Sequence, residues 1–304
     1  MPLPTRLALA LTLCVWVAGC GGSSTDDAKK QPAAGTLEAF WRAPGEDVAI
    51  VPGAADFAPG RIRLSFLVVD GQGRVVNRPT ARVWLARTLT AKPFLQTTAR
   101  SEPIGVDGSE EADATAIYVT HLDVPEAGKY WVLAEPVGGR KIQAVGNVVV
   151  ARKTEAPDVG DPAIASKTPT IASTGGDFAA LTTRKPPDRG LLRSSIAEAL
   201  AAKAPFVVTF STPQFCATRT CGPVVDVVDT VRKRFDGTGI RFIHVEIYTD
   251  NDPAKGTNRW VAEWKLPSEP FTFLVGRDGL VKERFEGTLS VRELADAVQS
   301  TLAA

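Results

Sequence analysis

Two cysteines in the C-terminal third, Cys216 and Cys221, have the residue type and spacing for thiol chemistry. A thiolate acts as the nucleophile in disulfide exchange and as a metal ligand. Cys221 is followed by Gly222 and Pro223, and proline suits the first turn of a helix, where a missing N–H costs nothing. Because the positive end of a helix favours a nearby thiolate, this arrangement predicts a reactive thiol pair.

The elements that must position this pair alternate between helix and strand. Ser195 with Glu198, and Ser290 with Glu293, form capping boxes that open the first and last helices of the region. Apolar residues at helical spacing follow Pro223, and a short β-branched run precedes the cysteines. The expected order of helix, strand, helix, strand, helix, strand, strand and helix covers residues 195–203, 206–210, 224–235, 240–247, 257–264, 271–275, 280–285 and 290–302.

This region resembles the thioredoxin-like fold superfamily. Residues 206–210 resemble its central strand, and 221–224 resemble the Cys-Gly-Pro-Cys motif, with valine in place of the second cysteine. Residues 268–272 resemble the loop in which the family holds a cis-proline, here Pro270. The resemblance implies an α/β domain over 190–304, with a central mixed sheet flanked by helices, and a catalytic site of Cys216, Cys221 and Pro270.

The region departs from the family pattern in two ways. Four residues separate the cysteines instead of two, so neither the redox potential nor the direction of transfer carries over. Thr209 stands where many thioredoxins have a buried aspartate that accepts the proton of the resolving thiol. Glu246 on the neighbouring strand is a candidate substitute, although a surface or packing role is the simpler interpretation.

Either sulfur is a candidate for the attacking one. Cys221 lies next to the expected helix start, and the field of a helix end falls off within about one turn, so we expect Cys221 to attack and Cys216 to resolve. Counting from the strand instead places Cys216, six residues after Phe210, close to the family's position for the nucleophile. A disulfide between Cys216 and Cys221 is expected in either case, because two neighbouring thiols pair readily in an oxidising compartment.

The compartment is indicated by the N-terminus. Residues 1–19 read as a signal peptide, whose uncharged segment 7–18 is too short for the roughly 20 residues of a spanning helix. The segment ends in Val-Ala-Gly-Cys, which resembles the bacterial lipobox, and the resemblance implies cleavage before Cys20 and lipidation of its thiol. Residues 20–35 are a polar tether. We therefore expect an extracytoplasmic protein that is lipid-anchored to the bacterial membrane.

Residues 36–151 show a different pattern from the C-terminal third. Short alternating apolar segments are separated by Gly-containing turns, with no convincing helix between them, which favours an immunoglobulin-like β-sandwich. Residues 152–189 carry five prolines among Ser, Thr, Ala and Asp, and read as a semi-extended linker.

Composition excludes several classes of function. The formal net charge is only +1, so no field attracts nucleic acid, and the run Arg232–Arg234 reads as the solvated face of a helix. A zinc site would require Cys216, Cys221, His244 and a carboxylate to converge, and His244 reads better as a satisfied strand residue. We expect neither a metal nor a cofactor.

Two hypotheses on function remain open. The first is a membrane-anchored thiol–disulfide oxidoreductase that cycles Cys216 and Cys221 against the thiols or disulfides of envelope proteins. The second is a non-catalytic envelope lipoprotein, in which the disulfide staples one loop and the β-sandwich domain binds a partner. The position of the cysteines at a helix start opposite Pro270 favours the first. The spacing of the cysteines and the missing aspartate favour the second. The oligomeric state is unknown.

Overall fold

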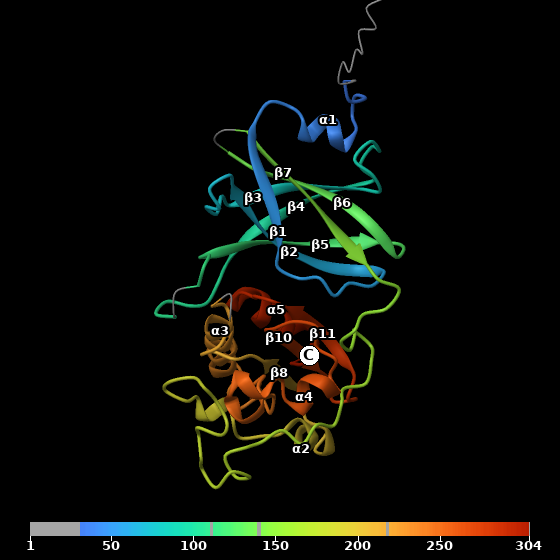
Figure 1. The fold of residues 1–304 in the computed structure, drawn as a ribbon. Helices are drawn as coiled ribbons and strands as arrows, with labels where there is room; N and C mark the ends of the chain where they lie inside the picture. The colour runs from blue at the N-terminus through green and yellow to red at the C-terminus, as the bar shows by residue number, and fades with distance from the viewer. Residues whose placement is uncertain (1–30, 110–111, 139–140, 217–218, 304) are drawn as a thin grey trace, which may run out of the picture. The chain divides into compact units, whose positions relative to one another are not determined.

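The computed structural model describes residues 31–303, apart from 110–111, 139–140 and 217–218. The N-terminal portion of the described chain consists of one short helix and seven strands (Figure 1). These are α1 (Leu37–Trp41), β1 (Glu46–Pro52), β2 (Gly60–Asp70), β3 (Thr80–Ala86), β4 (Leu95–Pro103), β5 (Ala116–Val124), β6 (Gly128–Pro136) and β7 (Ile142–Val150).

The seven strands form a single sheet that closes into a barrel, in the order β1-β2-β5-β4-β3-β6-β7. Strand β1 closes it by pairing antiparallel with β2 and parallel with β7. Alternate residues of β2 fill the interior, where Ile62, Leu64, Phe66 and Val68 are buried. Side chains of this size are sufficient to fill the interior of a small barrel, which is therefore a packed core.

The remaining chain contributes four strands and a few helices. These are η1 (Arg189–Leu191), α2 (Ile196–Ala201), β8 (Phe206–Phe210), α3 (Cys221–Arg234), β9 (Arg241–Val245), η2 (Thr249–Asn251), η3 (Pro253–Lys255), α4 (Arg259–Glu263), β10 (Phe271–Val275), β11 (Val281–Glu286) and α5 (Val291–Thr301). The strands form a second sheet in the order β11-β10-β8-β9. Strand β8 runs parallel to β9 and antiparallel to β10.

An apolar core covers each face of the second sheet. Helices α3 and α5 supply one core through Val224, Val228 and Leu294. The other contains Trp264, whose ring centroid lies 5.2 Å from that of Phe210. Strand β8 is buried along its whole length, as its β-branched run predicts, and it therefore fixes the start of the loop that carries the cysteines.

The expected fold is wrong in both of its parts. We expected an immunoglobulin-like sandwich followed by an α/β thioredoxin-like domain flanked by helices. The molecule is instead mostly β, with a closed seven-stranded barrel and a four-stranded sheet accompanied by few helices. The resemblance rested on motifs of four or five residues, which determine local backbone but not how many helices cover a sheet or whether a sheet closes.

Several local predictions are confirmed. Ser195 and Ser290 each cap a helix and form the predicted capping boxes with Glu198 and Glu293. The predicted hairpin is formed by β10 and β11. The peptide bond before Pro270 is cis. Local signals of capping and turn formation therefore identified these elements even where the expected architecture failed.

The segment between the barrel and the second sheet, 152–188, is described in full and contains no helix or strand. It does not stand away from the protein. Gly160 donates its N–H to the carbonyl oxygen of Val281 at 2.9 Å, and Ala156 and Leu181 are buried. The boundaries expected for separate domains, at 36–151, 152–189 and 190–304, stay predictions.

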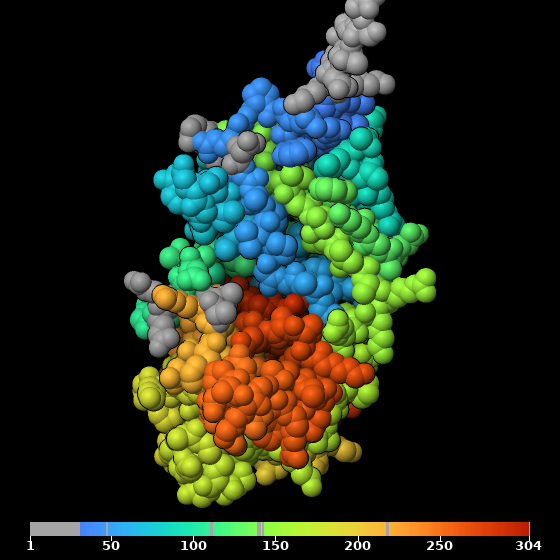
Figure 2. Space-filling model, viewed as in Figure 1, coloured from blue at the N-terminus to red at the C-terminus, as the bar shows by residue number. Residues whose placement is uncertain are grey.

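Strand β11 and helix α5 lie against the barrel, and in Figure 2 their red atoms adjoin the blue atoms of the N-terminal strands. Arg63 of β2 pairs with Glu293 of α5, and Arg284 of β11 pairs with Asp56. The carboxylate of Glu286 accepts hydrogen bonds from the N–H groups of Ala55 and Asp56. Ion pairs and carboxylate-to-backbone hydrogen bonds therefore join the barrel to β11 and α5.

Candidate functional site

The two sequence-predicted cysteines lie at the end of β8. Cys216 is in the loop after the strand, and Cys221 is the first residue of α3. The Ser211 hydroxyl donates a hydrogen bond of 3.1 Å to the carbonyl oxygen of Cys221, which ties the strand end to the helix start. Pro223 lies in the first turn of α3, as predicted, where its missing N–H leaves no helix bond unmade.

The two sulfurs are brought together with a carboxylate that the sequence analysis did not identify. The sulfur atoms of Cys216 and Cys221 and a carboxylate oxygen of Glu269 all lie within 4.8 Å of one another. Cys216 is half-buried, whereas Cys221 is completely buried at 0% exposure. The Cys216 sulfur also lies 3.9 Å from the hydroxyl of Thr220.

The surroundings of Cys221 disfavour its thiolate. A hydrogen bond with Cys216 contributes most to raising the pKa of Cys221 far above its usual range, followed by burial and by the negative charges of Cys216 and Glu269. A backbone hydrogen bond from Thr212 acts in the opposite direction and is outweighed. The expectation that the helix end acidifies Cys221 is therefore not met in this environment.

Glu269 directly precedes Pro270 in the loop that leads into β10. Burial raises the pKa of Glu269 to about 7, with further contributions from the charges of Cys216 and Glu246. Its Oε2 is buried and has no hydrogen-bond partner among the described residues. The only signal for Glu269 in the sequence is its position beside Pro270, because an isolated glutamate carries no pattern of its own.

Pro270 itself is buried, and its carbonyl oxygen accepts a hydrogen bond of 2.8 Å from Gly287 N–H. It therefore holds the Glu269 loop against the end of β11. Thr209, at the position considered for a proton-accepting aspartate, accepts a hydrogen bond of 3.0 Å from the hydroxyl of Thr272. This threonine pair links β8 to β10 and supplies no group that titrates near neutral pH.

Glu246 and His244 are both buried beside the site but are held by the segment 152–188. Thr183 donates its N–H and its hydroxyl to Glu246 Oε1, at 2.6 and 2.8 Å, while Glu246 Oε2 has no partner in the described chain. The His244 ring contacts the Ser211 carbonyl oxygen at 2.9 Å and the Thr182 hydroxyl at 3.4 Å. His244 is therefore a satisfied strand residue, as expected, and does not join the cysteines.

Tyr248 completes the acidic surroundings of the thiols. Burial raises the pKa of Tyr248, and the charges of Glu269, Cys221 and Cys216 raise it further. The ring of Tyr248 also packs edge-on against Phe215, with 6.3 Å between the ring centroids. Two thiols, two carboxyl groups and a phenol thus share one region around the end of β8.

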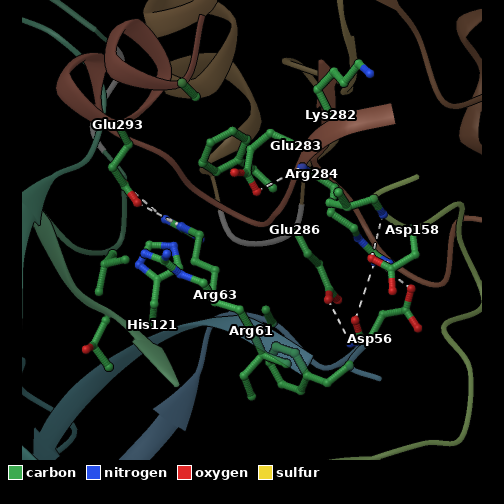
Figure 3. Close-up of a pocket in the computed structure, with 18 of the residues that line it drawn as sticks. Asp56, Arg61, Arg63, His121, Asp158, Lys282, Glu283, Arg284, Glu286 and Glu293 are labelled. Carbon is green, nitrogen blue, oxygen red and sulfur yellow. Dashed lines mark hydrogen bonds and ion pairs between the residues drawn. The ribbon is translucent and has the colours of Figure 1, made fainter. Parts of the chain in front are cut away.

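A cavity of about 900 Å³ lies elsewhere, where β2 and β5 face β11 and α5. Figure 3 shows Arg61, Arg63 and His121 on its barrel wall, with Glu293 bonded to Arg63. The pKa of His121 is lowered by burial and by the neighbouring charges of Arg61 and Arg63. None of the described residues that line this cavity is a cysteine, so the thiol chemistry lies outside it.

Two residues of the basic run 232–234 are paired with an acidic side chain of the same helix. Arg232 pairs with Asp229 at 2.7 Å and Lys233 pairs with the same carboxylate at 2.6 Å. Both pairs lie along one face of α3, at the spacing that brings helix side chains together. The interpretation as a helix face is consistent with these contacts.

The lipidation site at Cys20, the signal peptide and most of the tether lie outside the described residues. Within the described part of the chain, no helix is both long and apolar enough to cross a membrane. No protein-family model matches the sequence, and no curated protein matches it. The site must therefore be interpreted from its own geometry.

Proposed function

We propose that this chain is a thiol–disulfide oxidoreductase, anchored outside the cytoplasm by lipid on Cys20, which exchanges disulfides through Cys216 and Cys221. The observation that carries the proposal is the approach of the two sulfurs to within 4.8 Å at the end of a buried strand. Disulfide exchange requires one sulfur that a partner can reach and a second that can displace the partner afterwards. The pair supplies both.

The difference in burial assigns the two roles. Cys216 is half-buried and can be approached by a partner's sulfur, whereas Cys221 has no exposed surface. A helix end typically contributes about 0.3–1 kcal/mol to stabilising a nearby anion, which is too little to offset burial beside other acidic groups. Cys216 is therefore the attacking sulfur and Cys221 the resolving one, the reverse of the order favoured by the sequence.

The reduction of a partner disulfide proceeds in two balanced steps. The Cys216 thiolate attacks one sulfur of the partner, a bond forms between the two sulfurs, and the partner's second sulfur leaves with the bonding electron pair and takes up a proton. Cys221 then loses its proton and attacks the Cys216 sulfur, releasing the partner's first sulfur as a thiol. Two electrons have moved from the cysteine pair to the partner, and the reverse sequence oxidises a partner dithiol.

The reduction potential of the pair tests the proposal. The full chain with Cys14 and Cys20 replaced by serine is equilibrated in glutathione buffers of graded potential, and the remaining free thiols are counted. We expect a single two-electron transition above about −300 mV, the range of catalytic pairs. A potential below that value, or no disulfide at any potential tested, would contradict the proposal. The first of these results would support a structural staple in a non-catalytic lipoprotein.

The anchor is tested separately. Wild-type chain expressed in a bacterium with a lipoprotein-processing pathway is expected to incorporate radiolabelled palmitate and to fractionate with membranes. The Cys20→Ser variant is expected to lose the label, while Cys216→Ser retains it. A wild-type chain that is unlabelled and soluble would contradict the lipid anchor and leave the redox proposal unaffected.

A further inference from the structure

The ligand types around the cysteine pair are those of a metal site. Two sulfurs and one carboxylate oxygen converge within 4.8 Å, from the loop after β8, the start of α3 and the loop before β10. Zinc binds sulfur at about 2.3 Å and carboxylate oxygen at about 2.0–2.2 Å. Tetrahedral ligands at those lengths lie roughly 3.3–3.8 Å apart. Because the three atoms lie within 4.8 Å of one another, closing them around an ion shortens each separation by no more than about 1.5 Å.

The unpartnered carboxylate oxygens are an independent observation that points to a cation. Glu269 Oε2 is buried and, within the described chain, no donor reaches it. The same holds for Oε2 of the nearby Glu246. Burying a carboxylate oxygen without a donor is costly, and proteins usually satisfy such groups with a hydrogen bond, a counter-charge or a metal.

The charges around Glu269 are consistent with this reading. The two groups whose charges act on Glu269 are Cys216 and Glu246, and both are acidic. Tyr248 adds a further acidic group that interacts with the same thiols. An array of groups that carry only negative charge when ionised is one that a divalent cation would stabilise, because the cation removes their mutual repulsion.

We infer that the reduced site binds Zn²⁺ through the sulfurs of Cys216 and Cys221 and the carboxylate of Glu269, with water as the fourth ligand. Two thiolates exclude Mg²⁺ and Ca²⁺, which require oxygen ligands, and the carboxylate favours zinc over Cu⁺. Binding releases the two thiol protons. Forming a disulfide between the cysteines removes two of the three ligands, so metal binding and the proposed redox cycle exclude each other.

Zinc binding is measured on the full chain with Cys14 and Cys20 replaced by serine, reduced and kept free of oxygen. Competition against a chromogenic zinc chelator gives the dissociation constant, and Co²⁺ in place of zinc reports sulfur ligands through a thiolate charge-transfer band. We expect one ion per chain and a cobalt band. Glu269→Gln should weaken binding by about 100-fold, and Cys216→Ser should abolish it together with the band.

The control is the Glu283→Gln variant. Burial also raises the pKa of the Glu283 carboxyl on β11, but no thiol is among the groups that shift this pKa. The variant should bind zinc as the starting protein does. Absence of zinc binding by reduced chain with two titratable thiols would overturn the inference. If Glu269→Gln bound zinc as tightly as the starting protein, the site would have only the two sulfurs as protein ligands, and the three-ligand assignment would be overturned.

The zinc site does not depend on the proposed redox function, so a failure of zinc binding can be distinguished from a failure of disulfide exchange. Glu269→Gln retains both sulfurs, so its reduction potential in glutathione buffers is expected to match that of the starting protein within about 30 mV. Loss of zinc binding with an unchanged potential would confirm separate roles. Zinc binding by a chain that forms no disulfide would support the metal site and contradict the redox proposal.

Discussion

Two of the regions in which the described residues bury charge differ in how that charge is compensated. Where the barrel meets β11 and α5, Arg63, Arg284 and Glu286 each have a partner of opposite charge or a set of backbone donors. Around the end of β8, Glu269 and Glu246 each keep a buried oxygen without a donor. The first region compensates its carboxylates with cations or backbone donors, although Nη1 of Arg63 and Nη1 of Arg284 have no hydrogen-bond partner among the described residues. The second region leaves one carboxylate oxygen of each glutamate without a donor.

The contrast indicates which of the two regions is the better candidate for chemistry. A buried ionic group with all its partners in place contributes to positioning the elements it joins. A buried acidic group without a partner is retained at a cost in stability, which is typical of sites that bind or react. In this protein the cavity of about 900 Å³ lies at the paired region, whereas the thiols lie at the unpaired one.

The largest effect is expected from breaking the paired region. Arg63 and Glu293 have side chains 7% and 8% exposed and form two hydrogen bonds, and Arg63 also donates to the Thr288 carbonyl oxygen at 2.9 Å. Arg63→Ala leaves Glu293 buried without its counter-charge. We expect a loss of about 3–5 kcal/mol in the free energy of unfolding, measured by urea denaturation.

The control for that measurement is Arg82→Ala. Arg82 pairs with Glu135 but its side chain is 50% exposed. Its removal should change the free energy of unfolding by no more than about 1 kcal/mol. Equal effects of the two substitutions would show that burial does not distinguish these pairs.

A smaller effect is expected from comparing one glutamate of each region. Glu286 accepts hydrogen bonds from Ala55 N–H, Asp56 N–H and the Ser268 hydroxyl, at 2.9, 2.8 and 2.7 Å. Glu286→Gln should lower the free energy of unfolding by about 1.5–3 kcal/mol. The amide loses the charge-assisted hydrogen bonds, and its NH₂ group faces a donor where the carboxylate had an accepting oxygen. Glu269→Gln should cost less than about 0.5 kcal/mol or stabilise the protein, because the replaced oxygen had no donor. A larger loss from Glu269→Gln would contradict the contrast between the regions.

His244 sharpens the comparison through pH, since it is buried near the thiols but has both ring nitrogens in contact with partners. Burial is the main reason that its pKa is lowered, so the folded protein keeps the ring neutral. The unfolded chain takes up a proton below about pH 6.5, so stability is complete above that pH and falls as pH decreases towards the lower folded pKa. The slope is at most about 1.4 kcal/mol per pH unit.

Urea denaturation between pH 7.5 and 5 checks this expectation. The difference in unfolding free energy between wild type and His244→Gln should shrink as the pH falls, since only wild type has this proton to bind on unfolding. His121→Gln provides the comparison, because burial also lowers the pKa of His121, with the charges of Arg61 and Arg63 as the next contributions. A difference between wild type and His244→Gln that is constant with pH would contradict the assignment of a buried neutral ring.

The sequence was sufficient for elements whose signals are local. The capping boxes at Ser195 and Ser290, the strand 206–210 and the hairpin 271–285 depend on residues within a few positions of one another, and the structure has all of them. The closure of the barrel could not be predicted in the same way. It depends on β1 pairing with β7, which joins Val48 to Ala144 across almost a hundred residues and leaves no local pattern.

The site was predictable in part for the same reason. Cys216, Cys221 and Pro223 stand out because their types and spacing are informative within one turn of chain. Glu269 was missed because its importance arises from long-range packing that carries it to the sulfurs. The order of attack that we propose differs from the order expected from the sequence, because the sequence shows that Cys221 begins a helix but not that its side chain is fully buried.

The proposed roles of Cys216 as the attacking sulfur and Cys221 as the resolving sulfur are tested most directly by trapping the intermediate. Each single variant, Cys216→Ser and Cys221→Ser, in a background lacking Cys14 and Cys20, is treated with oxidised glutathione, and the mass of the intact protein is followed with time. We predict that Cys221→Ser accumulates one glutathione on Cys216. Cys216→Ser should react at least about tenfold more slowly, because the remaining sulfur, that of Cys221, is buried. The chain with both cysteines should form an internal disulfide without accumulating the glutathione adduct. Faster modification of Cys221 than of Cys216, or stable glutathione on the chain that retains both sulfurs, would contradict the account.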